Sequence, residues 1–131
     1  MSDDWTGARG RAEREVTAEV TARAFGSGLV PVFATPAMVA LMEEASVDAL
    51  AGRLAPGETT VGTRLEVSHL AATPVGDRVR AEAVLVGREG RRLIFDVTAW
   101  DSSEKIGEGR HERAVISRDR FLARVQAKAR R

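Results

Sequence analysis

The chain has 131 residues, 44% of them hydrophobic and 30% charged, which is typical of one globular domain with a modest core. Its 20 Lys and Arg residues against 19 Asp and Glu give a formal net charge of +1, so no overall field favours nucleic acid or an anionic membrane as a partner. The absence of cysteine excludes disulfides, a thiolate nucleophile and cysteine-ligated metal sites, and we expect a protein without a metal. No apolar run approaches the roughly 18 residues that span a bilayer, so we expect a cytoplasmic protein.

The N-terminal third is expected to contain one strand and one mobile loop. We expect a single domain over residues 1–131, with 1–12 and 119–131 as flexible or short helical tails because both ends are rich in charge. Residues 15–21 alternate with period two and are rich in valine and threonine, which predicts a strand. Residues 25–31 contain two glycines and a proline, which is typical of a loop able to act as a lid.

A helix start signal follows at Thr35. Threonine before Pro36 predicts an N-cap followed by proline at the first helical position. A periodic apolar run then continues to about Leu50, and Gly52 is the predicted stop. The sequence therefore predicts one long helix.

One carboxylate of this helix, that of Glu43, falls on its apolar side. Spacings of four and seven residues place it between Val39, Val47 and Leu50, whereas its neighbour Glu44 lies on the polar side. A carboxylate in such a place must be paired, protonated or active in a site. Glu43 is thus the first candidate functional residue.

Four strands joined by short turns are predicted after the helix, at residues 59–71, 78–86, 92–100 and 104–116. The alternation places one set of side chains of the first of these strands on an inward face: Val61, Thr63, Leu65, Val67 and His69. Short turns make the sheet antiparallel, and the long helix is its only large apolar cover. The fold class is therefore α+β, with one long central helix wrapped by a curved sheet. Such a small layer leaves edges and apolar residues uncovered, so we expect a homodimer at least.

Several motifs of this chain resemble the hot-dog fold thioesterases, and within them the fluoroacetyl-CoA thioesterase type. The resemblance runs from about Val30 to the C-terminus without a gap. It is carried by these segments: residues 33–35 (Phe-Ala-Thr), 38–43 (Met-Val-Ala-Leu-Met-Glu), 62–63 (Gly-Thr), 67–74 (Val-Ser-His-Leu-Ala-Ala-Thr-Pro), 89–93 (Glu-Gly-Arg-Arg-Leu) and 111–116 (His-Glu-Arg-Ala-Val-Ile).

The resemblance implies a site as well as a fold. It implies that Thr35, Glu43 and His69 form the catalytic set, in active sites at a dimer interface to which both chains contribute. We expect the substrate to contact a second group of residues: Gly62, Thr63, Leu29, Phe33 and Arg113. The substrate is an acyl thioester of coenzyme A or of a carrier protein, with no further cofactor. Pairing of dimers into a tetramer is left open.

The three residue types suit thioester hydrolysis, which needs a nucleophile or base, an oxyanion donor and a proton for the leaving thiolate. Glu43 could attack the carbonyl to form an anhydride or could deprotonate water, and the sequence does not choose between these. His69 could act as acid, base or hydrogen-bond donor, and Thr35 could position Glu43 or water. Backbone N–H groups near the helix start or near Gly62 are candidates for the oxyanion hole.

Structural explanations stand beside these roles. Glu43 could pair with an arginine across the dimer, His69 could be a satisfied core histidine, and Thr35 could only cap the helix. Gly62 could mark a bulge or close strand packing. Arg113 is expected, with His111, on a solvated strand face, so it ranks only as a candidate binding residue.

The lid departs from the fluoroacetyl-CoA thioesterase pattern. That family carries phenylalanines just before the catalytic threonine, and the matching positions here are Gly26 and Leu29. The hydrolytic set is therefore intact while the set that selects the fluorinated acyl group is not. Two other functions stay open on the same fold: a different enzyme such as a dehydratase, and an acyl-binding or dimerisation module without catalysis.

Overall fold

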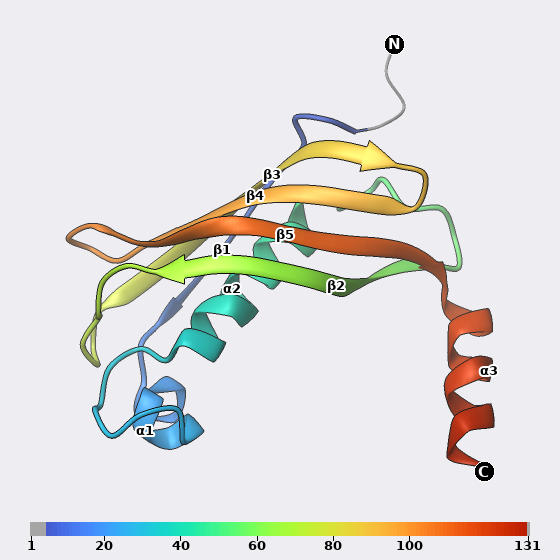
Figure 1. Cartoon of the computed structure of the whole chain (residues 1–131). Helices are drawn as coiled ribbons and strands as arrows, with labels where there is room; N and C mark the ends of the chain where they lie inside the picture. The colour runs from blue at the N-terminus through green and yellow to red at the C-terminus, as the bar shows by residue number, and fades with distance from the viewer. Residues whose placement is uncertain (1–4, 131) are drawn as a thin grey trace.

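The computed structural model describes residues 5–130 and shows one five-stranded antiparallel sheet curved around a central helix (Figure 1). The strands are β1 (Arg9–Glu15), β2 (Glu58–His69), β3 (Arg78–Glu89), β4 (Arg92–Trp100) and β5 (Lys105–Ser117), in the spatial order β1-β3-β4-β5-β2. The helices are η1 (Ala18–Val20), α1 (Ala22–Phe25), α2 (Thr35–Ala49) and α3 (Arg118–Ala129). The predicted fold class, the long helix and the four strands that follow it are confirmed.

The predicted first strand is wrong. Residues 15–21 do not form a strand, since β1 ends at Glu15 and the chain then turns through η1. The strand lies earlier, at Arg9–Glu15, so that it begins inside the stretch 1–12 expected to be a tail, and it pairs along its whole length with β3. Ala8 and Ala12 are buried while the arginines between them are exposed, because α2 covers one face of β1. Residues 1–4 of the expected tail lie outside the described residues.

The core lies between α2 and the inner face of the sheet. α2 contributes Met38, Leu41 and Met42, all almost fully buried, and the inward residues of β3 and β4 face them as the alternation predicted. α2 can approach β1 closely because position 10 is glycine: a Cβ there would lie 2.2 Å from both the carbonyl oxygen of Ala45 and the amide nitrogen of Ala49. The helix is thereby fixed against the sheet and carries its polar residues to defined places.

The predicted inward face of β2 is wrong before residue 63, because the strand contains a bulge there. Gly62 pairs with Arg113 and Arg64 with Glu112, so Thr63 is the extra residue. After the bulge the expected odd-numbered residues, Leu65 to His69, share the inner face. Before it the phase is reversed, so that Gly62 lies inward with Arg113, and Val61 lies outward opposite Ala114.

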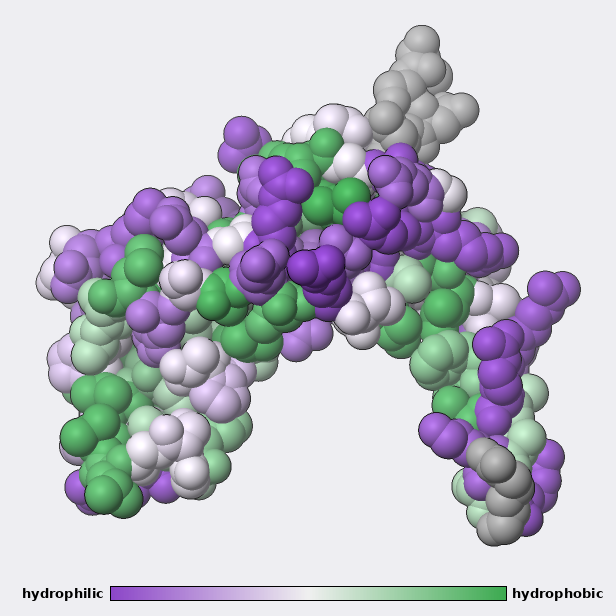
Figure 2. Space-filling model, viewed as in Figure 1, coloured by the Kyte–Doolittle hydropathy of each residue, from purple (hydrophilic) through white to green (hydrophobic). Residues whose placement is uncertain are grey.

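α3 continues from β5 and projects from the end of the sheet away from α1 (Figure 1). It is helical as far as Ala129 and has no buried residue, although Leu122 and Val125 are apolar. Figure 2 shows the molecule hollowed between the α1 end and α3, with hydrophobic residues around the arch. Within residues 5–130, no helix has both the length and the apolar character that crossing a membrane requires.

Candidate active site

Thr35 and His69 are in direct contact although they are 34 residues apart in sequence. Thr35 Oγ1 lies 2.7 Å from His69 Nδ1, which joins the start of α2 to the end of β2. The N-cap prediction for Thr35 is wrong: Ala34 occupies the N-cap position, no side chain caps the helix, and Thr35 is the first helical residue. Its hydroxyl is committed to the imidazole instead. Two of the three expected catalytic residues are therefore brought together.

The imidazole of His69 lies beside a small cavity. Nε2 is buried and has no hydrogen-bond partner among the described residues. The cavity, of about 320 Å³, is lined by Thr35 and His69 together with Phe33, Ser27 and residues that follow β2. Burial lowers the pKa of His69 below its ordinary value, and a backbone group of Ala71 opposes this only in part. The imidazole is therefore neutral at neutral pH, with one nitrogen held by Thr35 and the other buried.

Glu43 lies at the other end of the site, beside β5. Its Oε2 is 3.4 Å from NH1 of Arg113, and its side chain is 41% exposed. Arg113 is itself fixed: its Nε donates to Thr60 Oγ1 at 2.9 Å, its NH2 donates to the Thr60 carbonyl at 3.2 Å, and NH1 lies 3.1 Å from His111 Nε2. The carboxylate thus has a pairing partner within its own chain.

The expected solvated face around His111 and Arg113 is wrong. His111 is 2% exposed and Arg113 is 6% exposed. Their side chains fit inside because Gly62, which pairs with Arg113 across β2 and β5, has no side chain: a Cβ there would lie 2.8 Å from Glu43 Oε2 and 3.2 Å from His111 Cε1. The charged alternation of β5 suggested a solvated surface, and the signal that could have corrected this is the glycine on the paired strand.

The remaining expected binding residues have different surroundings. Phe33 is buried and lines the cavity beside Thr35 and His69, whereas Leu29 is 90% exposed at the tip of the loop after α1. Thr63 sits in the bulge, where its hydroxyl donates to the Glu112 carbonyl at 3.2 Å. Phe33 thus lies by the Thr35–His69 pair, while Thr63 adjoins the end of the site that holds Glu43.

Within one chain the two halves of the expected catalytic set are separate. Thr35 and Glu43 are eight residues apart on α2, which corresponds to about 12 Å along the helix axis. Thr35 contacts His69, whereas Glu43 contacts Arg113. The three side chains of a single chain are therefore not assembled around one reacting atom.

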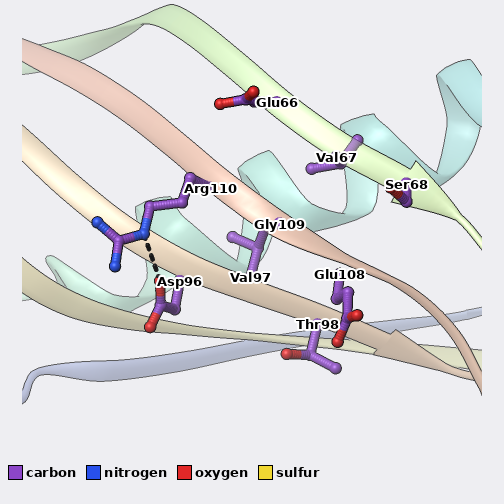
Figure 3. A pocket seen from close by; sticks show the side chains of 9 residues that line it. All are labelled: Glu66, Val67, Ser68, Asp96, Val97, Thr98, Glu108, Gly109 and Arg110. Atoms are coloured by element: carbon purple, nitrogen blue, oxygen red, sulfur yellow. Dashed lines mark ion pairs between the residues drawn. The ribbon is translucent and has the colours of Figure 1, made fainter.

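A larger cavity lies elsewhere, on the outer face of β2, β4 and β5 (Figure 3). It measures about 500 Å³ and is lined by charged side chains, among them the ion pair of Arg110 with Asp96 at 2.9 Å. It is open to solvent and contains neither Thr35, His69 nor Glu43. Its size alone therefore does not make it the functional site, and the chemistry points to the smaller cavity.

Comparison with known proteins places this arrangement in a family. The family described as fluoroacetyl-CoA-specific thioesterase matches residues 16–119. The chain belongs to this family. The resemblance stated from the sequence is confirmed, and the chain is a thioester hydrolase with the hot-dog fold. Family membership favours hydrolysis over the dehydratase and the non-catalytic module.

Relatives support the assignment over most of the chain. The fluoroacetyl-CoA thioesterase of Streptantibioticus cattleyicolor is 52% identical over 97 residues, which cover 74% of this chain and 70% of the relative. A solved structure of a fluoroacetyl-CoA thioesterase is 43% identical, with a TM-score of 0.88 over 94% of this chain and 96% of the other. A thioesterase superfamily member from Thermus thermophilus is 31% identical, with a TM-score of 0.89 over 95% and 93% of the two chains.

Proposed function

We propose that this chain hydrolyses acyl-CoA thioesters as a homodimer with two composite active sites. In each site, Thr35 and His69 come from one subunit and Glu43 from its partner. The observation that carries the proposal is the 2.7 Å contact of Thr35 Oγ1 with His69 Nδ1, in an imidazole that lines a cavity and whose buried Nε2 has no hydrogen-bond partner among the described residues.

The topology supports a composite site. β2 is an edge strand, which pairs only with β5 within the described residues, and so offers a free edge to a second copy. An antiparallel pair of β2 strands around a two-fold axis would set the His69 end of one strand beside the Gly62 region of the other. Since Glu43 lies against Gly62, the partner subunit's Glu43 would then approach His69. Exposed apolar residues such as Val47 and Leu70 would gain cover in the same assembly.

The proposed chemistry assigns one task to each residue. The Thr35 hydroxyl donates to Nδ1 of neutral His69, so Nε2 carries the proton and can donate it toward the thioester. Glu43 deprotonates a water molecule, whose oxygen attacks the thioester carbonyl. The C–S bond then breaks, and the thiolate of coenzyme A receives the proton that Glu43 took from the water. The products are a carboxylic acid and free coenzyme A, and coenzyme A is required only as part of the substrate.

The lid supports a further proposal about the acyl group. The loop after α1 carries Gly26 and Leu29 at the positions where the sequence resemblance placed phenylalanines, and Leu29 is 90% exposed. Because neither of these two positions carries an aromatic side chain, we expect acetyl-CoA and fluoroacetyl-CoA to be hydrolysed with similar kcat/KM. A Leu29→Phe variant is expected to favour the fluorinated substrate more than the wild type does.

The test is thiol release from a panel of short, long, aromatic and fluorinated acyl-CoAs. Glu43→Gln and His69→Ala are expected to lower kcat/KM by about 10²-fold to 10⁴-fold, as for general acid–base groups. Glu44→Gln is the matched control, because Glu44 is the exposed neighbour on the same helix. Unchanged turnover in Glu43→Gln would remove Glu43 from the mechanism, and turnover of no acyl-CoA by the wild type would refute the substrate class.

A further inference from the structure

His111 is a buried titratable residue to which the proposed chemistry gives no task. It is 2% exposed, lies on β5 two residues before Arg113, and stacks near Phe95 of β4 with ring centroids 6.4 Å apart. Both ring nitrogens have polar neighbours. Those neighbours decide which nitrogen carries the proton.

The contacts of His111 permit one protonation state. Nδ1 lies 2.9 Å from the carbonyl oxygen of Arg64, which can only accept, so Nδ1 must carry a proton and donate. Nε2 lies 3.1 Å from NH1 of Arg113, which can only donate, so Nε2 must be bare and accept. His111 is therefore the neutral tautomer protonated at Nδ1.

The same guanidinium nitrogen that donates to His111 also faces Glu43. NH1 of Arg113 lies 3.1 Å from His111 Nε2 and 3.4 Å from Glu43 Oε2, while Nε and NH2 are held by Thr60. The orientation of NH1 is thus set by Thr60 on one side and by His111 on the other. With a side chain that is 41% exposed, Glu43 depends on this nitrogen for its direction.

We propose that His111 is a positioning residue that aims the carboxylate of Glu43 through Arg113. It does so only while neutral, because an imidazolium has no lone pair for Arg113 and would present an N–H to a guanidinium. The inference rests on the proposed function, since it assigns a part of the same site. It goes beyond the catalytic set by adding a residue that does not touch the substrate.

The surroundings keep His111 in that state. The groups that face it are Arg113 and Glu112 from β5, Glu43 from α2, the Arg64 carbonyl from β2 and the Phe95 ring from β4. Burial lowers the pKa of His111 below its ordinary value; Arg113 adds to this, while the hydrogen bond to the Arg64 carbonyl and the two carboxylates oppose it.

Two substitutions separate positioning from a merely structural role. Asparagine at position 111 can place an amide near Nδ1 and keep the contact with Arg64, but it loses the acceptor for Arg113. Glutamine can place an amide oxygen near Nε2 and keep the acceptor for Arg113, but it loses the contact with Arg64. If His111 only joined β5 to β2, His111→Asn would be the milder change.

We expect His111→Asn to lower kcat by about tenfold to a hundredfold with little change in KM, as for a misaimed catalytic group. His111→Gln should stay closer to the wild type. In a Glu43→Gln background, neither substitution should lower kcat further, because the group that they aim is absent. Equal or greater loss in His111→Gln, or an undiminished loss in the Glu43→Gln background, would overturn the inference.

A measurement on the wild type tests the proposal even if the variants at position 111 fail to fold. The chain has two histidines, so nitrogen NMR of the imidazoles can assign both. At neutral pH, His111 should be protonated at Nδ1 and bare at Nε2, and any other state refutes the inference. If Glu43→Gln alone leaves turnover unchanged, the proposed function fails at Glu43 and the inference fails with it. If Glu43→Gln is inactive but the two variants at 111 behave alike, the inference alone fails.

Discussion

Mixed dimers of two inactive variants should recover activity if each active site is shared between subunits. The perturbation pairs a Glu43→Gln chain with a His69→Ala chain. One site then combines the intact His69 of the first chain with the intact Glu43 of the second, and the other site lacks both. A dimer purified with a different affinity tag on each chain should therefore have about half the kcat of the wild type, because one of two sites is whole.

The geometry explains why a single chain is not expected to form a complete active site by itself. Thr35 holds His69, and Glu43 lies about 12 Å further along α2, so a single chain does not bring all three groups to one carbonyl. The assay is steady-state thiol release at saturating acyl-CoA, with the parent homodimers measured alongside. A mixed dimer as inactive as its parents would refute the shared site.

A second pairing gives the opposite outcome and serves as the control. A chain carrying both Glu43→Gln and His69→Ala is paired with a wild-type chain. In shared sites each site then lacks one group, so the dimer should be inactive. Sites contained in single chains would instead leave about half of the activity, because the wild-type chain would keep its complete set.

Three further predictions follow from packing, titration and charge. Gly10→Ala should destabilise the fold by about 3 kcal/mol or more, since its Cβ would meet the backbone of α2. Gly28→Ala is the control and should be nearly neutral, because its Cβ would lie 3.4 Å from the nearest atom, the Cβ of Ala22. Urea unfolding measures both variants, and equal effects would contradict the close approach of α2 to β1. The pKa of His111 is lower in the folded protein than the value of about 6.5 in the unfolded chain, so the unfolded chain binds more protons and the free energy of unfolding should fall as the pH drops below about 6.5. Urea unfolding at a series of pH values should show that His111→Gln weakens this dependence, and an unchanged slope would exclude His111 as its source. Arg120 and Arg124 line a cavity of about 240 Å³ beside α3. Replacing both with alanine should raise KM for acyl-CoA but not for the matching acyl-pantetheine, because acyl-pantetheine lacks the nucleotide phosphates. An equal rise of KM for both substrates would argue against phosphate contacts.

Most of the fold could be predicted because its apolar patterns are regular. The buried residues of α2 recur every three to four positions and those of β3 and β4 every second position, and the short turns between the strands leave few topologies. β1 was missed because its inward residues are as small as Gly10 and Ala12, while its outward residues are charged. Alternation of charged with small residues was the available signal, and the small side chains there reflect the closeness of α2.

The site could be predicted only in part. Thr35 and His69 were expected together from the family resemblance, and the structure places them in contact. The network behind Glu43 was missed, because alternating charges on β5 look solvated until the strand is paired with one that has glycine opposite them. Pairing is a long-range property, so no local pattern reports the burial of His111 and Arg113.

The bulge in β2 has a consequence for how this chain can vary in length. Gly62 and His69 are seven positions apart, an odd number, and in an uninterrupted strand they would point to opposite sides of the sheet. The extra residue at Thr63 brings them to the same side of the sheet. A single insertion or deletion between them would place them on opposite sides again and so separate the two halves of the site. Changes of one residue between these positions should therefore abolish turnover while the sheet still forms, whereas gains or losses of two should be far better tolerated.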